Sequence, residues 1–244
     1  MLRTVMYAVY FGIVLLISQL CMILPYYILR WLGLRGLSRA FMRKAGPIMA
    51  KAVIFGLGSR ISVEGLENVP LDEQRICIVA NHQSLFDIPL VVASLPIVPG
   101  FIAKAELKKV PFLNFWLFAM GSILLDRKSP RSAIKAINEG VERIKQGQPI
   151  CIFPEGTRSR TGRLNSFKPG SLKLALRSGS VIVPLTIRNS CNLFEKPRRI
   201  QSAHVFLTVH PAVTTAELDT DSQKRLPERL QETIGGPLTA EDAY

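Results

Sequence analysis

The sequence is poor in the residues that build metal centres and disulfide frameworks. It holds four cysteines and three histidines in 244 residues, and no cysteine has the spacing of a zinc or iron–sulfur site. Three of the cysteines lie in apolar runs, so we expect buried free thiols, as is usual in reducing compartments. The cysteines are Cys21, Cys77, Cys151 and Cys191. No set of metal ligands is visible, and we expect neither a metal nor a cofactor.

Several signatures of large protein classes are also absent. The chain has no zinc finger, no RNA-recognition signature and no basic helix followed by heptads, which argues against nucleic acid as a partner. It lacks the Gly-x-Ser-x-Gly turn of serine hydrolases. Its net charge is nevertheless +13. A basic surface can simply be solvated, but beside an apolar membrane segment it favours anionic lipid as the partner.

Charged residues are missing altogether between Thr4 and Leu29. A run of this length crosses a bilayer core of about 30 Å as a helix, and Pro25 is a point where that helix can kink or end. A signal peptide would have a shorter apolar stretch and a small-residue cleavage site. A buried core helix of a soluble domain is rarely apolar all round over so many turns. We therefore interpret the run as a membrane segment, which either spans once or folds back within one leaflet.

Basic residues are distributed unequally around this segment. Arg3 precedes it, whereas the residues that follow include Arg30, Arg35, Arg39, Arg43, Lys44 and Lys51. Because cytoplasmic flanks are enriched in Lys and Arg, the part of the chain after the segment is expected on the cytoplasmic side. The sequence thus predicts a protein of the cell inner membrane whose main domain faces the cytoplasm.

Beyond the apolar segment, short β-branched runs alternate with segments of helical length. The strand-like runs cover 75–80, 96–103, 122–126, 149–153, 181–187 and 204–209, with one more strand from Ile61. The helical segments cover 84–94, 105–119, 130–146, 168–178 and 221–234. This alternation predicts an α/β fold with a mixed, largely parallel sheet flanked by helices. We divide the chain into a membrane-anchoring helical segment (1–57), an α/β domain (58–215) and a polar C-terminal tail (216–244).

One polar loop directly follows a predicted buried strand. The apolar run 76–80 is succeeded by Asn81, His82 and, five residues beyond the histidine, Asp87. In α/β proteins chemistry is placed just past the carboxyl ends of such strands. An Asp that hydrogen-bonds a His fixes its tautomer and lets the other ring nitrogen act as a general base. Such a pair is also common in ordinary polar loops, so it needs support from the rest of the chain.

A second loop of the same kind follows the run Ile150–Ile152 and reads Phe-Pro-Glu-Gly-Thr-Arg-Ser over 153–159. Gly156 permits a positive φ, and Arg158 offers a planar fork suited to phosphate. Lys104 and Arg127 follow two further strand-like runs. Since the carboxyl ends of parallel strands meet at one edge, these cations are expected near His82.

The motifs together resemble the glycerolipid acyltransferase family, in particular the bacterial 1-acyl-sn-glycerol-3-phosphate acyltransferases, over about residues 60–190. Four blocks occur in the family's order. They are Asn81 with His82 and Asp87; Lys104 and Leu107 followed by Gly121 and Arg127; Phe153 to Ser159; and Val183-Pro184-Leu185. The N-terminal membrane segment also agrees with the family.

The resemblance implies transfer of a fatty acyl group from acyl-CoA or acyl carrier protein to the sn-2 hydroxyl of lysophosphatidic acid, giving phosphatidic acid. His82 would take the hydroxyl proton and Asp87 would stabilise the imidazolium. The acceptor phosphate would be held by Lys104, Arg127 and Arg158. The remaining motif residues would shape the pocket, namely Asn81, Glu155, Gly156, Thr157 and Pro184.

Three alternatives stay open at this point. The first is an acyltransferase for another lysolipid acceptor, since the His loop acts on a hydroxyl of any such lipid. The second is a hydrolase in which His82 and Asp87 activate water or a serine on lipid substrates. The third is a membrane scaffold without catalytic activity. The aromatic segment 110–120 is likewise either core or a surface that contacts lipid.

Overall fold

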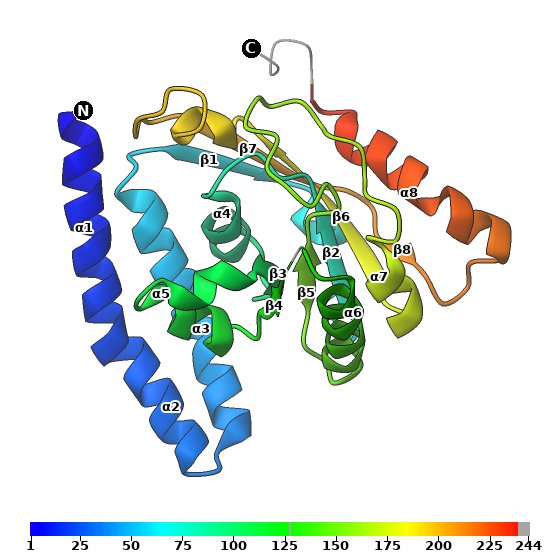
Figure 1. The fold of residues 1–244 in the computed structure, drawn as a ribbon, viewed down its shortest axis with the longest axis horizontal. Helices are drawn as coiled ribbons and strands as arrows, with labels where there is room; N and C mark the ends of the chain where they lie inside the picture. The colour runs from blue at the N-terminus through cyan, green and yellow to red at the C-terminus, as the bar shows by residue number, and fades with distance from the viewer. Residues whose placement is uncertain (127, 239–244) are drawn as a thin grey trace.

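The computed structural model describes residues 1–126 and 128–238 of the protein. In these ranges an eight-stranded sheet carries helices on both faces (Figure 1). The strands are β1 (Arg60–Glu64), β2 (Ile76–Ala80), β3 (Gly100–Lys104), β4 (Ile123–Leu125), β5 (Ile150–Ile152), β6 (Val181–Arg188), β7 (His204–Val209) and β8 (Val213–Thr214). The α-helices are α1 (Leu2–Ser18), α2 (Leu24–Trp31), α3 (Arg35–Phe55), α4 (Asp87–Ser94), α5 (Leu113–Ala119), α6 (Pro130–Lys145), α7 (Lys173–Ser178) and α8 (Thr220–Gly235). Short helical turns are η1 (Gln19–Ile23), η2 (Leu66–Asn68), η3 (Ala105–Lys109) and η4 (Ser190–Leu193).

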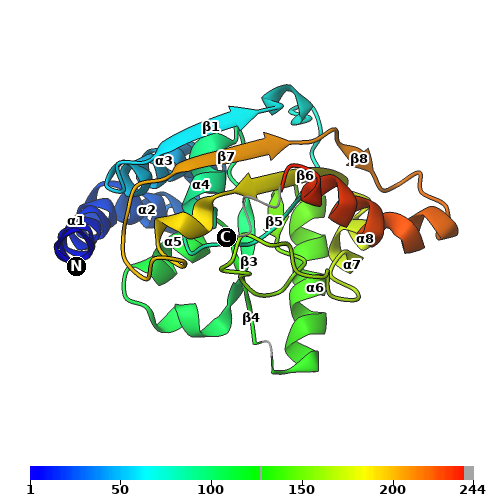
Figure 2. The same cartoon turned by 90° about the horizontal axis from the view of Figure 1, so that it is seen from above.

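The sheet has the order β1-β7-β6-β2-β5-β3-β4, and β8 pairs with β6 off this path. Figure 2 shows β1 and β7 at one edge of the sheet and β4 at the other. Paired strands are parallel except where β6 meets β7 and β8. The predicted mixed, largely parallel α/β fold is therefore confirmed. Because β2, β3, β5 and β6 run in the same direction, the loops that follow them reach one common edge.

Alternation along the strands divides the core into two layers. Ile76 and Ile78 of β2 face a core shared with α3 and α4, whereas Cys77 and Val79 face a core shared with α6, α7 and α8. Both sides of the strand are buried, which explains its unbroken apolar sequence. Cys77 and Cys151 are buried free thiols, as expected from their apolar runs. Cys191 is buried as well, whereas Cys21 is exposed although it lies in the apolar N-terminal segment.

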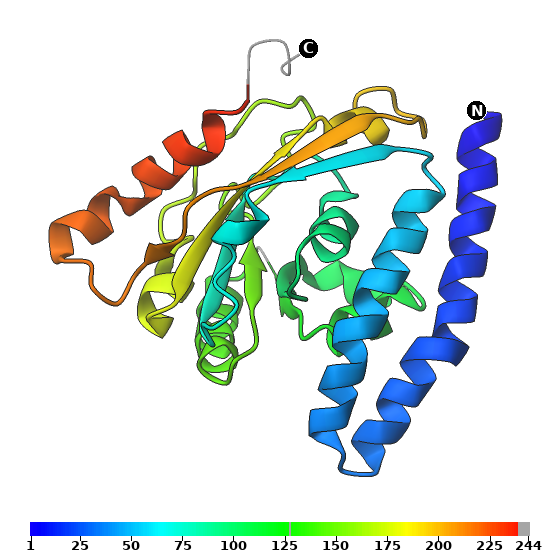
Figure 3. The ribbon, with the colours of Figure 1, turned by 180° about the vertical axis from the view of Figure 1, so that it is seen from behind.

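At the N-terminus, α1 and α2 form one helix that packs antiparallel to α3, on the side of the molecule away from α8 (Figure 3). The phenol groups of Tyr7 and Tyr10 donate to backbone carbonyls of α3, at 3.1 and 2.8 Å. Pro25 neither ends nor interrupts the helix. It lacks the N–H that would bond one turn back, and the helix widens into the π-turn η1 just before it.

Three predicted helices are shorter than their sequence patterns indicated. The segment 84–94 becomes helical only at Asp87, and the segment 168–178 only at Lys173, after Gly170 with φ +78°. The segment 105–119 is divided into η3 and α5, because Pro111 removes a donor and Phe112 adopts a φ of +64°. These turns give the loops at the sheet edge room to fold back over the strand ends.

The aromatic segment combines both of the expected roles. Trp116 is buried, whereas Phe112, Phe115 and Phe118 are each more than 40% exposed. The ring of Phe115 lies 6.2 Å from that of Tyr27 in an edge-to-face contact. The outward side of α5 therefore continues the apolar surface of α2.

Candidate active site

A cavity of about 610 Å³ opens at the carboxyl edge of β2, β3 and β5. His82 and Phe153 line it where β2 and β5 end. Among the described residues, four cations line it as well, one from the end of β3 and three from the loop after β5. These cations are Lys104, Arg158, Arg160 and Lys168. Elsewhere the wall is apolar, with Ile102, Leu125 and Ile137 among its residues. The cavity therefore offers a basic part beside an imidazole and an apolar part beyond it.

Asn81 determines where the chain leaves the sheet. Its side-chain amide donates to the carbonyl of Ile187 at 2.8 Å, and its amide oxygen accepts from the Ile187 N–H at 2.7 Å. The buried side chain thus replaces the next pair of ladder hydrogen bonds between β2 and β6. His82, the following residue, is released from the sheet at a fixed point.

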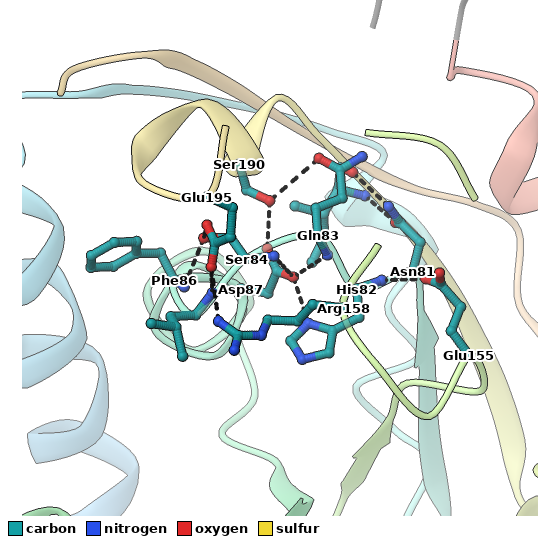
Figure 4. A network of polar contacts seen from close by, with 12 residues as sticks. Asn81, His82, Gln83, Ser84, Phe86, Asp87, Glu155, Arg158, Ser190 and Glu195 are labelled. Atoms are coloured by element: carbon teal, nitrogen blue, oxygen red, sulfur yellow. Dashed lines mark hydrogen bonds and ion pairs between the residues drawn. The ribbon is translucent and has the colours of Figure 1, made fainter. Parts of the chain in front are cut away.

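His82 and Asp87 form the hydrogen bond that their spacing predicts, with 2.7 Å between Nδ1 and Oδ2 (Figure 4). The same carboxylate oxygen accepts from the backbone N–H groups of Gln83 and Ser84, at 2.7 and 2.8 Å. The other oxygen accepts from the Ser190 hydroxyl at 2.6 Å. Since Asp87 is fully buried and acts as an acceptor, we assign the ring proton to Nδ1. The lone pair of the neutral imidazole then lies on Nε2, where it can take a proton.

The imidazole plane is fixed from one side by Phe153. The two rings stack with 4.1 Å between centroids and 14° between planes. Phe101 stands behind Phe153 at a centroid distance of 6.2 Å. The ring of His82 therefore has little rotational freedom before any ligand arrives.

Glu155 supports the backbone of the same loop. One of its oxygens accepts from the His82 N–H at 2.6 Å, and the other accepts from the Asn165 N–H at 2.9 Å. Burial raises the pKa of this carboxyl group above its usual value, although the two N–H groups act in the opposite direction. Next to it, Gly156 has a φ of +69°, and a Cβ there would lie 2.8 Å from Cε of Lys168. This position thus uses both the positive φ and the close approach that a glycine permits, and Thr157 follows it on the cavity wall.

Arg158 lies close to the histidine loop and is bound by an unforeseen partner. Its Nη1 is 2.9 Å from Oε1 of Glu195, whose side chain is only 4% exposed. Glu195 also accepts from the Ser84 hydroxyl at 2.7 Å and from the Leu85 N–H at 2.8 Å (Figure 4). One carboxylate thus connects the loop after β2 with the loop after β5.

The other predicted site residues are less closely grouped. Lys104 lines the same cavity but is half-exposed and pairs with Glu106 at 3.0 Å. Pro184 lies within β6 opposite Val79 and is not among the cavity-lining residues. Arg127 lies outside the described residues. Within 1–126 and 128–238, no group of three or more His, Cys, Asp or Glu side chains is arranged to hold a metal ion.

Sequence reasoning missed four residues of this site, one of which is the cavity-lining Arg160 in the loop after β5. Ser190 and Glu195 come from the segment after β6, and Lys168 comes from the loop before α7. Ser190 and Glu195 contact residues more than 100 positions away, so no local spacing could have identified them. The glycine at position 156 is an indirect signal for Lys168, because a residue without a Cβ permits the close approach of another group.

Comparison with known proteins gives a consistent result. A family model described as Acyltransferase matches residues 60–188. The 1-acyl-sn-glycerol-3-phosphate acyltransferase of Borreliella burgdorferi is 34% identical over 178 residues, which are 72% of this chain and 71% of that protein. A chloroplastic 1-acyl-sn-glycerol-3-phosphate acyltransferase of Arabidopsis thaliana is 38% identical over 128 residues, but these are 52% of this chain and only 36% of the plant protein.

A solved structure extends the similarity over the full length. The crystal structure of the 1-acyl-sn-glycerophosphate (LPA) acyltransferase PlsC from Thermotoga maritima matches with a TM-score of 0.83 and 29% identity, covering 100% of this chain and 98% of that one. The matched family region contains both loops that form the histidine site, and the structural match includes the N-terminal helices. The chain therefore belongs to the acyltransferase family.

Proposed function

We propose that this protein transfers a fatty acyl group from a thioester donor to the sn-2 hydroxyl of 1-acyl-sn-glycerol 3-phosphate, forming phosphatidic acid. The observation that carries the proposal is the His82–Asp87 pair at a cavity with a basic and an apolar part. The relatives named 1-acyl-sn-glycerol-3-phosphate acyltransferase support the same acceptor.

In this reaction Nε2 of His82 takes the proton of the acceptor hydroxyl as its oxygen attacks the thioester carbonyl. Asp87 keeps the proton on Nδ1 and stabilises the imidazolium that forms. Collapse of the tetrahedral intermediate breaks the C–S bond, and the imidazolium returns the proton to the leaving thiolate. Chain residues thus supply both the base and the acid of one direct transfer.

The basic part of the cavity holds the acceptor phosphate. Arg158 provides a guanidinium fork beside the histidine loop, and Lys104 adds a half-exposed ammonium group at the same wall. We retain Arg127 as a further phosphate ligand because of its position in the second block of the sequence motif. Asn81 and Glu155 hold the surrounding backbone in shape, Gly156 and Thr157 line the cavity, and the apolar wall accommodates acyl chain.

The donor is a thioester of coenzyme A or of acyl carrier protein. Both carry negative charge, and the net charge of +13 favours either. Anionic membrane lipid is a further partner for the same reason. The reaction needs no cofactor.

The protein acts at a membrane. One helix, Leu2–Trp31, is long and apolar enough to cross a bilayer. Its outward side chains are more than half exposed, among them Val5, Met6, Val9, Ile13, Leu16 and Leu20. An apolar surface of this extent normally contacts lipid or a partner, and the exposed aromatics of α5 enlarge it.

We place the protein at the cell inner membrane with the catalytic domain facing the cytoplasm, because basic residues follow the apolar helix. Residues 1–57 form the anchor and 58–215 the catalytic domain. Residues 216–244 form a polar C-terminal part in which α8 packs on β6. An integral anchor resists extraction by high salt and is released by detergent, whereas release by salt alone would contradict it.

The function is tested by incubating detergent-solubilised protein with labelled acyl-CoA or acyl carrier protein and lysophosphatidic acid. We expect phosphatidic acid with at least one donor, and the faster donor identifies the partner. Lysophosphatidylethanolamine and lysophosphatidylglycerol serve as alternative acceptors in parallel reactions. If either of these lipids is acylated efficiently and lysophosphatidic acid is not acylated, the acceptor is another lysolipid than the one proposed. Release of free fatty acid without acylated product would instead indicate a hydrolase.

A further inference from the structure

Glu195 is a buried carboxylate that contacts both loops of the site. Oε2 accepts from the Ser84 hydroxyl, and Oε1 accepts from the Leu85 N–H and from Nη1 of Arg158, all between 2.7 and 2.9 Å. Its own chain position lies just after η4, so it reaches the site from a third strand end. Burial of a carboxylate is unfavourable unless it is paired, and here these three hydrogen bonds join Glu195 to residues of the two loops.

The geometry of these contacts restricts the guanidinium of Arg158. A guanidinium is planar and carries five N–H donors in a fixed fork. When Nη1 is held by Glu195, the direction of the remaining donors is fixed as well. Arg158 lines the cavity and its side chain is one-quarter exposed, so part of the fork is accessible to a ligand there.

The same oxygen that holds Arg158 also holds the backbone of Leu85, three residues after His82. The orientation of the cation is thereby linked to the position of the base. A substrate that has its phosphate on Arg158 and its hydroxyl at His82 needs both groups at a constant separation. Misplacement by about an ångström can cost a factor on the order of a hundred in rate.

We propose that Glu195 is a positioning residue for the acceptor, which orients Arg158 toward the acceptor phosphate and keeps that cation in register with His82. The proposal rests on the proposed acyl transfer and on phosphate binding by Arg158. It concerns a residue that acts through Arg158 and makes no contact with the substrate itself.

The proposal is tested with two substitutions of Glu195. Glu195→Ala removes the carboxylate. We expect the KM for lysophosphatidic acid to rise about tenfold or more, because a rise of this size corresponds to the loss of one charge-assisted hydrogen bond. In Glu195→Gln the amide oxygen can take the place of Oε1 and accept from both Leu85 and Arg158. The KM of this variant should therefore rise by roughly threefold or less. An increase for Glu195→Gln as large as for Glu195→Ala would overturn the positioning role.

A double-mutant cycle separates positioning from a merely structural contribution. If Glu195 acts through Arg158, then Glu195→Ala should raise the KM by no more than about twofold when Arg158 is already alanine. A second increase of about tenfold in the Arg158→Ala background would refute the inference. The matched control is Glu142→Gln, which removes an exposed carboxylate paired with Lys145 on α6 and should leave the KM unchanged.

Failure of the proposed function and failure of the inference about Glu195 give different results. Wild-type protein that forms no phosphatidic acid refutes the proposed function and this inference with it. Active wild-type protein with additive effects of Glu195→Ala and Arg158→Ala refutes the inference alone. Thermal unfolding of each variant identifies any that has lost its fold. If Glu195→Ala is unfolded, Glu195→Gln alone tests the inference, and a rise in its KM of about tenfold or more is the refuting result.

Discussion

Replacement of Asp87 by asparagine isolates the charge of the carboxylate from its geometry. Three donors converge on Oδ2, namely Nδ1 of His82 and the N–H groups of Gln83 and Ser84. They favour the rotamer in which the asparagine carbonyl occupies that position. The amide NH₂ then faces Ser190, whose hydroxyl can turn from donor to acceptor. The loop should therefore keep its shape in Asp87→Asn.

The loss is in the stabilisation of the imidazolium. The charge centres of an imidazolium and a hydrogen-bonded carboxylate are about 4 Å apart, and with an effective dielectric constant of about 20 their attraction amounts to about 4 kcal/mol. This stabilisation exists only once His82 has taken the proton, so it lowers the barrier rather than the energy of the free enzyme. We expect kcat to fall by about a thousandfold.

The assay is steady-state formation of phosphatidic acid, together with thermal unfolding of both proteins. Asp87→Ala is the comparison, because it leaves buried donors without an acceptor at about 1–3 kcal/mol each and should lower the melting temperature clearly. A kcat for Asp87→Asn within tenfold of wild type, with an unchanged melting temperature, would refute the assignment of charge stabilisation to Asp87.

Three further predictions concern stability. Glu155→Gln offers one acceptor oxygen to two partly buried backbone N–H groups, so the free energy of unfolding should fall by about 1–3 kcal/mol. Chemical denaturation measures this change, and equal stability would contradict the double acceptor role. Burial lowers the pKa of His210, so the unfolded chain binds the proton more strongly, and the free energy of unfolding should fall as the pH decreases from about 6.5 through the folded pKa. His210→Gln should remove this part of the pH dependence of the free energy of unfolding, and an identical pH dependence in both proteins would disprove the prediction. Gly100→Ala should destabilise the protein by about 1–3 kcal/mol or more, because a Cβ would collide with the carbonyl oxygen of Gly121. The control is Gly36→Ala, at a helical position with open space around it, and similar melting temperatures for the two variants would refute the predicted collision.

The sequence was most informative where structure is local. Asp87 lies five residues after His82 and starts a helix, so its carboxylate can turn back onto the imidazole and the adjacent N–H groups. Buried strands such as β2 were visible because both of their faces are apolar. The glycine at position 156 likewise permits the positive φ of 69° that the loop adopts there.

Contacts between distant segments could not be predicted in this way. The partner of Arg158 lies 37 residues further along the chain, in a loop whose sequence is otherwise basic. Pro111 interrupts the segment 105–119, which its helical length and period predict as one continuous helix. Which donors compete for one carboxylate depends on how three strand ends meet, and this is a property of the assembled sheet.

The central claim is that His82 is the base of an acyl transfer. The most direct measurement compares phosphatidic acid formation by wild type, His82→Ala and His204→Ala, where His204 is an exposed residue on β7. The account predicts a loss of about a hundredfold to ten-thousandfold for His82→Ala and wild-type activity for His204→Ala. Activity of His82→Ala within a few-fold of wild type, in protein that remains folded, would contradict the account.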